Sequence, residues 1–125
     1  PDNDSERFGS PLAKLITNAA VTHISMTPSA LSVLPLNPYP DLSHVIVAGE
    51  ACKPELVETW SSGRKFFNAY GPTEAAVYAT IASCYNGAEV MIGKPISNVE
   101  VAVLDRQGFP LERGQNGELW LAGMG

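Results

Sequence analysis

The sequence predicts an α/β fold in which a parallel sheet with flanking helices, in the order βαβαβ, is followed by a short antiparallel β subregion. Two observations support this prediction. Strand-like apolar runs alternate with helix-like segments over about residues 11–76, and residues 44–48 form a nearly continuous β-branched run, typical of a strand covered on both faces. Over about residues 77–125 the helix patterns disappear, and short β-like runs lie between glycines, prolines and asparagines.

The first part of the chain is predicted to alternate helices and strands. Ser10 and Thr27 can each cap a helix with proline in its first turn, and a third helix starts near Pro54 and ends before a Ser-Ser-Gly sequence. Strands are expected between them. The expected segments are a helix over residues 11–18, a strand over 21–26, a helix over 27–34, a strand over 44–48, a helix over 54–60 and a strand over 65–69.

The second part is predicted to be β-rich. Its β-like runs cover residues 77–83, 90–92, 99–104 and 118–121. The Arg-Gln-Gly sequence at residues 106–108 predicts a hairpin that pairs residues 101–104 with residues 109–111. We expect these strands to complete or abut the parallel sheet, because no clear linker separates the two parts.

Composition narrows the class of protein. With 125 residues and 45% hydrophobic side chains, the chain suits one globular domain. No apolar run approaches the ~20 residues that span a bilayer, so we expect no membrane segment. A net charge of −5 opposes attraction to a nucleic-acid backbone, so nucleic acid is not an expected partner. The two cysteines are isolated, which favours reduced thiols in a cytoplasmic protein.

The predicted parallel strands locate a site. Ligands of such sheets bind beyond the carboxyl ends of the strands, so residues 25–27, 48–50 and 69–74 should share one edge. Residues 68–74, with the sequence Asn-Ala-Tyr-Gly-Pro-Thr-Glu, combine an aromatic face, a tight turn, a hydroxyl and a carboxylate. These are the parts of a site for a nucleotide and magnesium.

At this motif the chain resembles the adenylate-forming enzymes, and within them the amino-acid-activating adenylation domains of nonribosomal peptide synthetases. The family motif Asn-x-Tyr-Gly-Pro-Thr-Glu is matched at every fixed position of residues 68–74. A second family motif, Gly-Glu-Leu-x-(apolar)-x-Gly-x-Gly, is matched at residues 117–125. The resemblance implies a partial adenylate-forming enzyme fold.

The resemblance also implies an activity. The family uses ATP and Mg²⁺ to convert an amino acid or similar carboxylic acid into aminoacyl-AMP and pyrophosphate, and then loads the phosphopantetheine thiol of a peptidyl carrier protein beside neighbouring synthetase modules. The chain starts without Met and stops inside the second motif, so we expect a fragment of the large N-terminal subdomain. Because the family's phosphate loop and catalytic Lys match no part of it, the isolated fragment is expected to be inactive.

Residue roles follow from the matched motif. The resemblance implies that Glu74 binds magnesium, that Thr73 contacts the α-phosphate, and that both act in catalysis. Hard carboxylate oxygens suit magnesium. Tyr70 can stack on adenine, and Asn68 can accept from the adenine amino group. The remaining residues expected at the nucleotide are Ala69, Gly71, Gly49, Glu50 and Ala51.

Each role has a structural alternative. Glu74 could be a solvated or helix-capping acid, Thr73 could satisfy its own turn, and Gly49 could simply end a strand. Tyr70 could be a core tyrosine, and Asn68 could form a turn. His23, His44, Trp60, Trp120 and Met91 are expected to have structural or packing roles rather than catalytic ones.

The matching substrate-pocket positions are mostly small or apolar, which favours an uncharged substrate side chain. They are Ser25, Ile46, Ala48, Ala69, Val77 and Tyr78. Two other functions stay open. One is an acyl-CoA synthetase or aryl-acid ligase of the same superfamily, and the other is a non-catalytic nucleotide-binding module. The asparagine, alanine and proline of residues 68–74 favour the peptide-synthetase branch.

Overall fold

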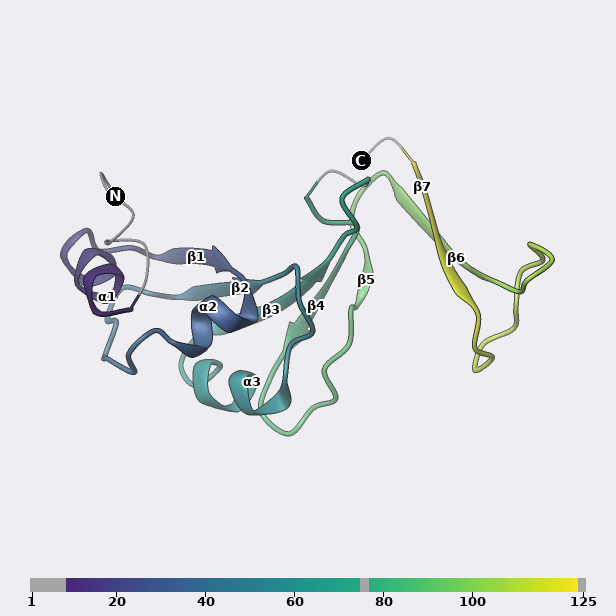
Figure 1. Ribbon diagram of the computed structural model, residues 1–125. Coiled ribbons are helices and arrows are strands. Elements are labelled where there is room, and N and C mark those ends of the chain that lie inside the picture. The colour runs from purple at the N-terminus through teal and green to yellow at the C-terminus, as the bar shows by residue number, and fades with distance from the viewer. Residues whose placement is uncertain (1–8, 75–76, 124–125) are drawn as a thin grey trace.

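A five-stranded mixed sheet forms the body of the molecule (Figure 1). The computed structural model describes residues 9–74 and 77–123. The first three strands are parallel, and the last two are antiparallel to their neighbours. In sheet order, which is also chain order, the strands are β1 (His23–Met26), β2 (His44–Val47), β3 (Lys65–Tyr70), β4 (Thr80–Cys84) and β5 (Lys94–Pro95). The predicted βαβαβ arrangement and an antiparallel completion of the sheet are confirmed.

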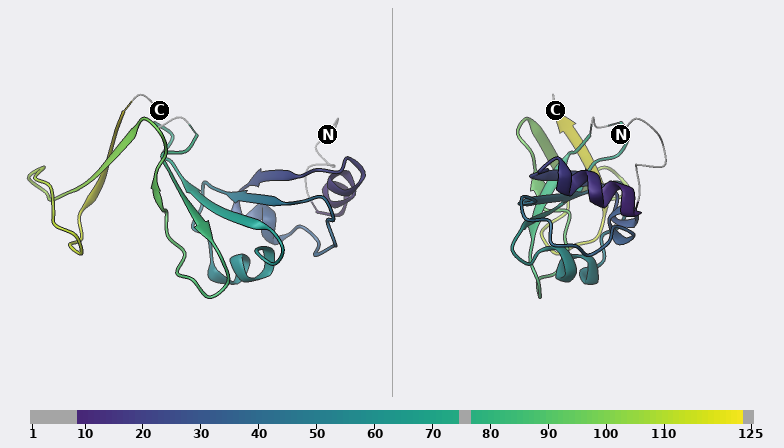
Figure 2. Two further views of the ribbon diagram at one scale, coloured as in Figure 1. Left: turned by 180° about the vertical axis from the view of Figure 1, so that it is seen from behind. Right: turned by 90° about the vertical axis from the view of Figure 1, so that its left-hand side faces the viewer.

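Two short helices connect the parallel strands and lie on the same side of the sheet (Figures 1 and 2). The helix α2 (Pro28–Ser32) has the predicted cap, because the Thr27 hydroxyl oxygen accepts a hydrogen bond from the Ala30 N–H at 3.2 Å. The helix α3 (Pro54–Trp60) also starts with proline. The helix α1 (Gly9–Asn18) lies at the end of the sheet near β1. None of the described helices has the length and apolar character of a membrane span.

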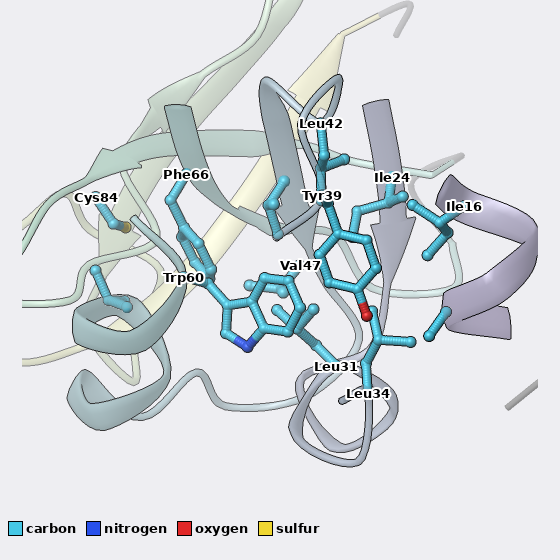
Figure 3. Packing of buried hydrophobic residues seen from close by; sticks show 13 residues of the cluster. Ile16, Ile24, Leu31, Leu34, Tyr39, Leu42, Val47, Trp60, Phe66 and Cys84 are labelled. Carbon is cyan, nitrogen blue, oxygen red and sulfur yellow. The ribbon is translucent and has the colours of Figure 1, made fainter. Parts of the chain in front are cut away.

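The core fills the space between the sheet and the helices (Figure 3). Trp60 of α3 is 2% exposed, and its indole stacks on the Tyr39 ring at a centroid distance of 5.8 Å. The packing role predicted for Trp60 is therefore confirmed. The other buried members come from all three helices, from β1 to β4 and from the α2–β2 connection: Ala13, Ile16, Ile24, Leu31, Leu34, Leu42, Val45, Val47, Val57, Phe66 and Cys84.

The opposite face of the parallel strands carries a row of stacked rings. Successive side chains of a strand alternate between faces, so His23 and His44 lie opposite the buried Ile24 and Val45. The two imidazoles stack at 4.1 Å, and the Phe67 ring lies 6.3 Å from that of His44. The histidines sit at the amino ends of their strands, away from the predicted site, as expected for structural residues.

A separate two-stranded sheet follows, formed by β6 (Val99–Leu104) and β7 (Glu118–Gly123), and it projects away from the larger sheet (Figure 1). The hairpin turn predicted at residues 106–108 forms: the Asp105 N–H donates to the Phe109 carbonyl and the Leu111 N–H donates to the Val103 carbonyl, each at 2.9 Å. The pairing of residues 109–111 is short, with one bridge from Pro110 to Leu104, and the main partner of β6 is β7, which pairs with it along its whole length. Trp120 is 54% exposed on this sheet, so its predicted packing role was wrong within the described residues.

The strand predicted at residues 90–92 is also absent from the structure, and β5 forms instead just beyond it. Within residues 90–92, two backbone carbonyl groups accept hydrogen bonds from buried polar side chains instead of from a neighbouring strand. Asn68 donates to the Met91 carbonyl at 2.9 Å, and Thr80 donates to the Ile92 carbonyl at 2.6 Å. The Met91 side chain itself is 59% exposed, which contradicts the packing role predicted for it.

The cysteine thiols are both free. Burial raises the pKa of Cys52 to about 11, helped by the nearby Cys84, and burial also raises the pKa of Cys84. Thiols with such high pKa values are protonated at neutral pH and are poor nucleophiles. This agrees with the predicted reduced state and gives the thiols no part in the site.

Candidate functional site

The carboxyl ends of β1, β2 and β3 meet at one edge of the sheet, as the sequence predicts. Met26 is paired in register with Val47, and Val47 with Asn68. The segments that follow these three positions therefore leave the sheet side by side. The Ala48 N–H extends the contact between the first two strands by donating to the Met26 carbonyl at 3.2 Å.

A cavity of about 380 Å³ lies at this edge. It is lined by Gly49, Glu50, Ala51, Asn68, Ala69, Tyr70, Gly71 and Ile92. All but one of these residues were predicted at the nucleotide. The exception is Ile92, which lies in a loop with no motif, so no local sequence signal could have identified it. The structure thus brings together two segments that are about twenty positions apart in the sequence.

Asn68 is held in a fixed orientation on the wall of this cavity. It belongs to β3 and is 7% exposed, so the alternative of a turn-forming Asn is wrong. Its amide nitrogen donates to the Met91 carbonyl at 2.9 Å. Because a carbonyl only accepts hydrogen bonds, this contact occupies the nitrogen and leaves the carboxamide oxygen as the atom that can accept from a ligand.

Tyr70 ends β3 and offers a ring to the cavity. Its side chain is 37% exposed, so the alternative of a core tyrosine is wrong. The next residue must be small: a Cβ on Gly71 would lie 2.9 Å from the Tyr78 Cα and 2.9 Å from the Val77 carbonyl oxygen. The returning chain therefore crosses directly over Gly71, which holds the loop in place beside the Tyr70 ring.

Thr73 and Glu74 lie farther along the same loop. Both side chains are exposed, and neither lines the cavity of residues 49–51 and 68–71. Their hydroxyl and carboxylate are free to meet a ligand that extends out of that cavity. Among the described residues no group of three His, Cys, Asp or Glu side chains is placed to hold a metal ion. A single carboxylate such as Glu74 still fits magnesium, which typically takes one or two protein carboxylates together with phosphates and waters.

The predicted substrate positions are brought together in part. The hydroxyl oxygens of Ser25 and Tyr78 lie 2.6 Å apart, and Ser25 is paired in register with Ile46. Ala69 is 3% exposed on β3, and Ala48 follows β2 at the same edge. Val77 is 70% exposed, and no described contact joins it to the other positions.

Comparison with known proteins agrees with this geometry. The family model described as AMP-binding enzyme matches residues 1–125. The chain is 44% identical over 117 residues to the phosphinothricin tripeptide synthetase PhsC of Streptomyces viridochromogenes, covering 94% of this chain and 11% of that protein. It spans only 2% to 20% of the length of the first curated relatives that it matches.

Solved structures show the same fold. The four-domain nonribosomal peptide synthetase AB3403, solved with AMP and glycine, superposes with a TM-score of 0.84 at 26% identity, over 94% of this chain and 9% of that one. The N-terminal subdomain of Klebsiella oxytoca NpsA, solved with 3-hydroxybenzoyl-AMSN, has a TM-score of 0.79 at 25% identity, over 90% of this chain and 30% of that one.

The chain belongs to the AMP-binding enzymes. Within that family, the proteins it resembles include nonribosomal peptide synthetases.

Proposed function

We propose that the chain is part of an adenylation domain that activates an amino acid with ATP, forming aminoacyl-AMP and pyrophosphate, and then loads the acyl group on the phosphopantetheine thiol of a carrier protein. Residues 1–125 would lie in the large N-terminal subdomain, with about residues 11–76 as its parallel α/β part and about residues 77–125 as its β-rich part. The protein would act in the cytoplasm, alongside neighbouring synthetase modules.

The observation that carries this proposal is the cavity beside the Tyr70 ring. A planar base that stacks on Tyr70 meets the carboxamide oxygen of Asn68, which can accept from an exocyclic amino group. The backbone of residues 49–51 lines the same cavity. An aromatic ring, one polar acceptor and close backbone are what an adenine needs for tight and selective binding.

The exposed loop beyond this cavity suits the phosphates. In the proposed reaction a carboxylate oxygen of the substrate attacks the α-phosphorus, the bond from that phosphorus to the bridging oxygen breaks, and pyrophosphate leaves. The Thr73 hydroxyl can donate to an α-phosphate oxygen. Glu74 can ligate magnesium, which when bound neutralises phosphate charge. These side chains would position the reacting groups and stabilise charge, which supply most of the rate in such reactions.

Substitution of Glu74 in the full-length protein tests this function. We expect amino-acid-dependent exchange of pyrophosphate into ATP by the wild type, and a loss of about 100-fold or more in Glu74→Ala with folding retained. Glu89→Ala is the matched control, because Glu89 is also exposed but lies in the connection before β5. Wild-type exchange that is unchanged in Glu74→Ala would remove Glu74 from the mechanism. Exchange catalysed by the isolated chain would contradict its expected inactivity.

One observation favours a second candidate, an aryl-acid ligase of the same superfamily. NpsA, whose N-terminal subdomain has this fold, was solved with 3-hydroxybenzoyl-AMSN. A panel of amino acids, aryl acids and fatty acids in the exchange assay separates the candidates. Exchange with an amino acid supports the first proposal, whereas exchange with aryl acids alone supports the second. Binding of MgATP without exchange for any acid would instead indicate a non-catalytic nucleotide-binding module.

A further inference from the structure

The exposed carboxylate of Glu50 is hydrogen-bonded to a residue of another loop. Its two oxygens accept hydrogen bonds from the Ser29 N–H at 3.0 Å and from the Ser29 hydroxyl at 2.7 Å. Ser29 stands 21 positions earlier in the chain, in the first turn of α2. The contact therefore ties the loop that follows β2 to the segment that follows β1.

The hydrogen bonds continue beyond Ser29. Its hydroxyl proton goes to Glu50, and its oxygen lies 3.1 Å from the Thr27 hydroxyl oxygen. Thr27 in turn accepts from the Ala30 N–H as the cap of α2. A Cβ on Gly49 would lie 3.8 Å from the Thr27 side chain, so the two loops are also in close contact. Glu50 is thus anchored to a helix start that is itself capped.

Glu50 occupies the wall between two cavities. One is the 380 Å³ cavity next to Tyr70, and the other is a cavity of about 490 Å³ next to α2 and α3. Glu50 and Ala51 line both of them, whereas Ser29 lines only the larger one. The carboxylate is therefore hydrogen-bonded to a residue of the larger cavity, although Glu50 also lines the smaller one.

The charge state of Glu50 supports a lasting contact. The hydrogen bonds from the Ser29 side chain and backbone hold the pKa of the Glu50 carboxyl below its usual range. The group is therefore ionised at neutral pH, and hydrogen bonds to an ionised acceptor are stronger than those between neutral groups.

We propose that Glu50 is a positioning residue, which holds residues 49–51 against the start of α2 and so sets the width of the cavity beside Tyr70. It acts on the nucleotide through the backbone of its own loop and not through its carboxylate. This inference rests on the proposed function, since it assigns the nucleotide to that cavity. It predicts that the contact with Ser29, rather than the charge of Glu50, determines the affinity for ATP.

The test uses the full-length protein and compares Glu50→Ala, Glu50→Gln, Ser29→Ala and the double variant Ser29→Ala with Glu50→Ala. The dissociation constant of MgATP is measured by calorimetry, and KM and kcat are measured by pyrophosphate exchange. Glu58→Ala is the matched control, because Glu58 is an exposed acid of α3 that lines neither cavity. Thermal unfolding of each variant shows whether it is folded at the assay temperature.

We expect Glu50→Ala to raise the dissociation constant and KM for ATP about tenfold, which corresponds to about 1.4 kcal/mol, with kcat nearly unchanged. Glu50→Gln should stay within about threefold of the wild type, since its carboxamide can still accept from one Ser29 donor. Ser29→Ala should also raise KM for ATP, by a smaller factor. The double variant should have the same KM as Glu50→Ala, because both substitutions disrupt the same contact between Ser29 and Glu50.

Three results would overturn the inference. The first is an unchanged affinity for ATP in Glu50→Ala. The second is a double variant in which the effects of Ser29→Ala and Glu50→Ala on the affinity add fully. The third is a loss of affinity in Glu50→Gln equal to that in Glu50→Ala, while Ser29→Ala has no effect. The last pattern would mean that the carboxylate touches the ligand itself. Calorimetry keeps the inference testable when no exchange is seen. Absence of exchange in the wild type contradicts the proposed function, whereas an unchanged affinity in a variant contradicts this inference alone.

Discussion

The side-chain oxygens of Ser25 and Tyr78 lie 2.6 Å apart, although the two residues are 53 positions apart in the chain. Ser25 belongs to β1, and Tyr78 belongs to the segment that returns across Gly71 to begin β4. The hydrogen bond therefore joins the first strand of the sheet to the chain that crosses the predicted nucleotide loop. It lies where the sequence predicts the substrate pocket.

Removing the Tyr78 hydroxyl should change recognition of the carboxylic acid substrate but not of ATP. A net contribution of about 1 kcal/mol for one hydrogen bond predicts a change of roughly fivefold in KM for the acid in Tyr78→Phe, with KM for ATP unchanged. Ser25→Ala should have a similar effect, since it removes the other partner. The measurement is pyrophosphate exchange with each substrate varied in turn. Equal changes in the KM for both substrates would contradict a role confined to the acid.

Loss of the Tyr70 ring should weaken ATP binding. Base–aromatic stacking is worth about 1–3 kcal/mol, so Tyr70→Ala should raise the dissociation constant of MgATP by roughly 5- to 150-fold, and Tyr70→Phe should keep most of the affinity. Tyr85→Ala is the control, because Tyr85 is 67% exposed and lies outside the cavity. Calorimetry with the full-length protein measures the change. Equal affinity in Tyr70→Ala and Tyr85→Ala would exclude stacking at this position.

A methyl group at Gly71 should disturb both folding and the site. It would lie within 3.0 Å of the backbone of residues 77–79, where no flexible side chain can move away. Gly71→Ala should therefore lower the free energy of unfolding by about 1–3 kcal/mol, and it should raise KM for the substrates by moving Tyr70 or Tyr78. Urea denaturation and exchange kinetics measure the two effects.

Gly63→Ala is the control that separates the effect of a steric clash at Gly71 from the effect of backbone strain. Gly63 has a φ of 71° and open space around it, so alanine there meets conformational strain but no clash. It should lower stability by about 1–2 kcal/mol without changing KM. If both variants changed only stability, the crossing over Gly71 would have no part in shaping the site.

Stability should fall in mild acid because of His44. Burial, the stacked His23 and Lys65 lower the pKa of His44 below its ordinary value of 6.5. The unfolded chain therefore binds a proton at His44 more readily than the folded chain does. The contribution of His44 to the free energy of unfolding is complete above pH 6.5, and it is lost as the pH falls toward the lower pKa of the folded state. His44→Asn should flatten this dependence in urea denaturation between pH 8 and pH 5. The same slope in the variant would assign the dependence to other groups.

Much of the fold was predictable from local patterns. The cap at Thr27, the prolines that open α2 and α3, and the apolar run of β2 act over a few positions, so the sequence showed them directly. Seven residues that the resemblance implies at a nucleotide line one cavity. Their segments come together because both adjoin the carboxyl ends of neighbouring parallel strands. A local motif and a topological rule were sufficient for this part of the site.

The failures share a physical cause. Turn chemistry predicted the turn at residues 106–108 but not the longer pairing of β6 with β7, which joins six positions. The strand expected at residues 90–92 does not form, and the Met91 and Ile92 carbonyls accept hydrogen bonds from the Asn68 and Thr80 side chains instead. Each outcome depends on a partner distant in the sequence, and no pattern within the segment reveals it.

The sequence by itself determined the order of helices and strands and the edge of the sheet at which residues 48–50 and 69–74 meet, because those follow from short-range periodicity and from the direction of parallel strands. Only the tertiary structure decided that Ile92 closes the cavity, that Glu50 is bound to Ser29 and that Ser25 meets Tyr78. These contacts join residues between 21 and 53 positions apart in the chain. They depend on how the loops cross after the sheet has formed, and side-chain atoms within 3 Å of each other are specified by that packing rather than by any local pattern.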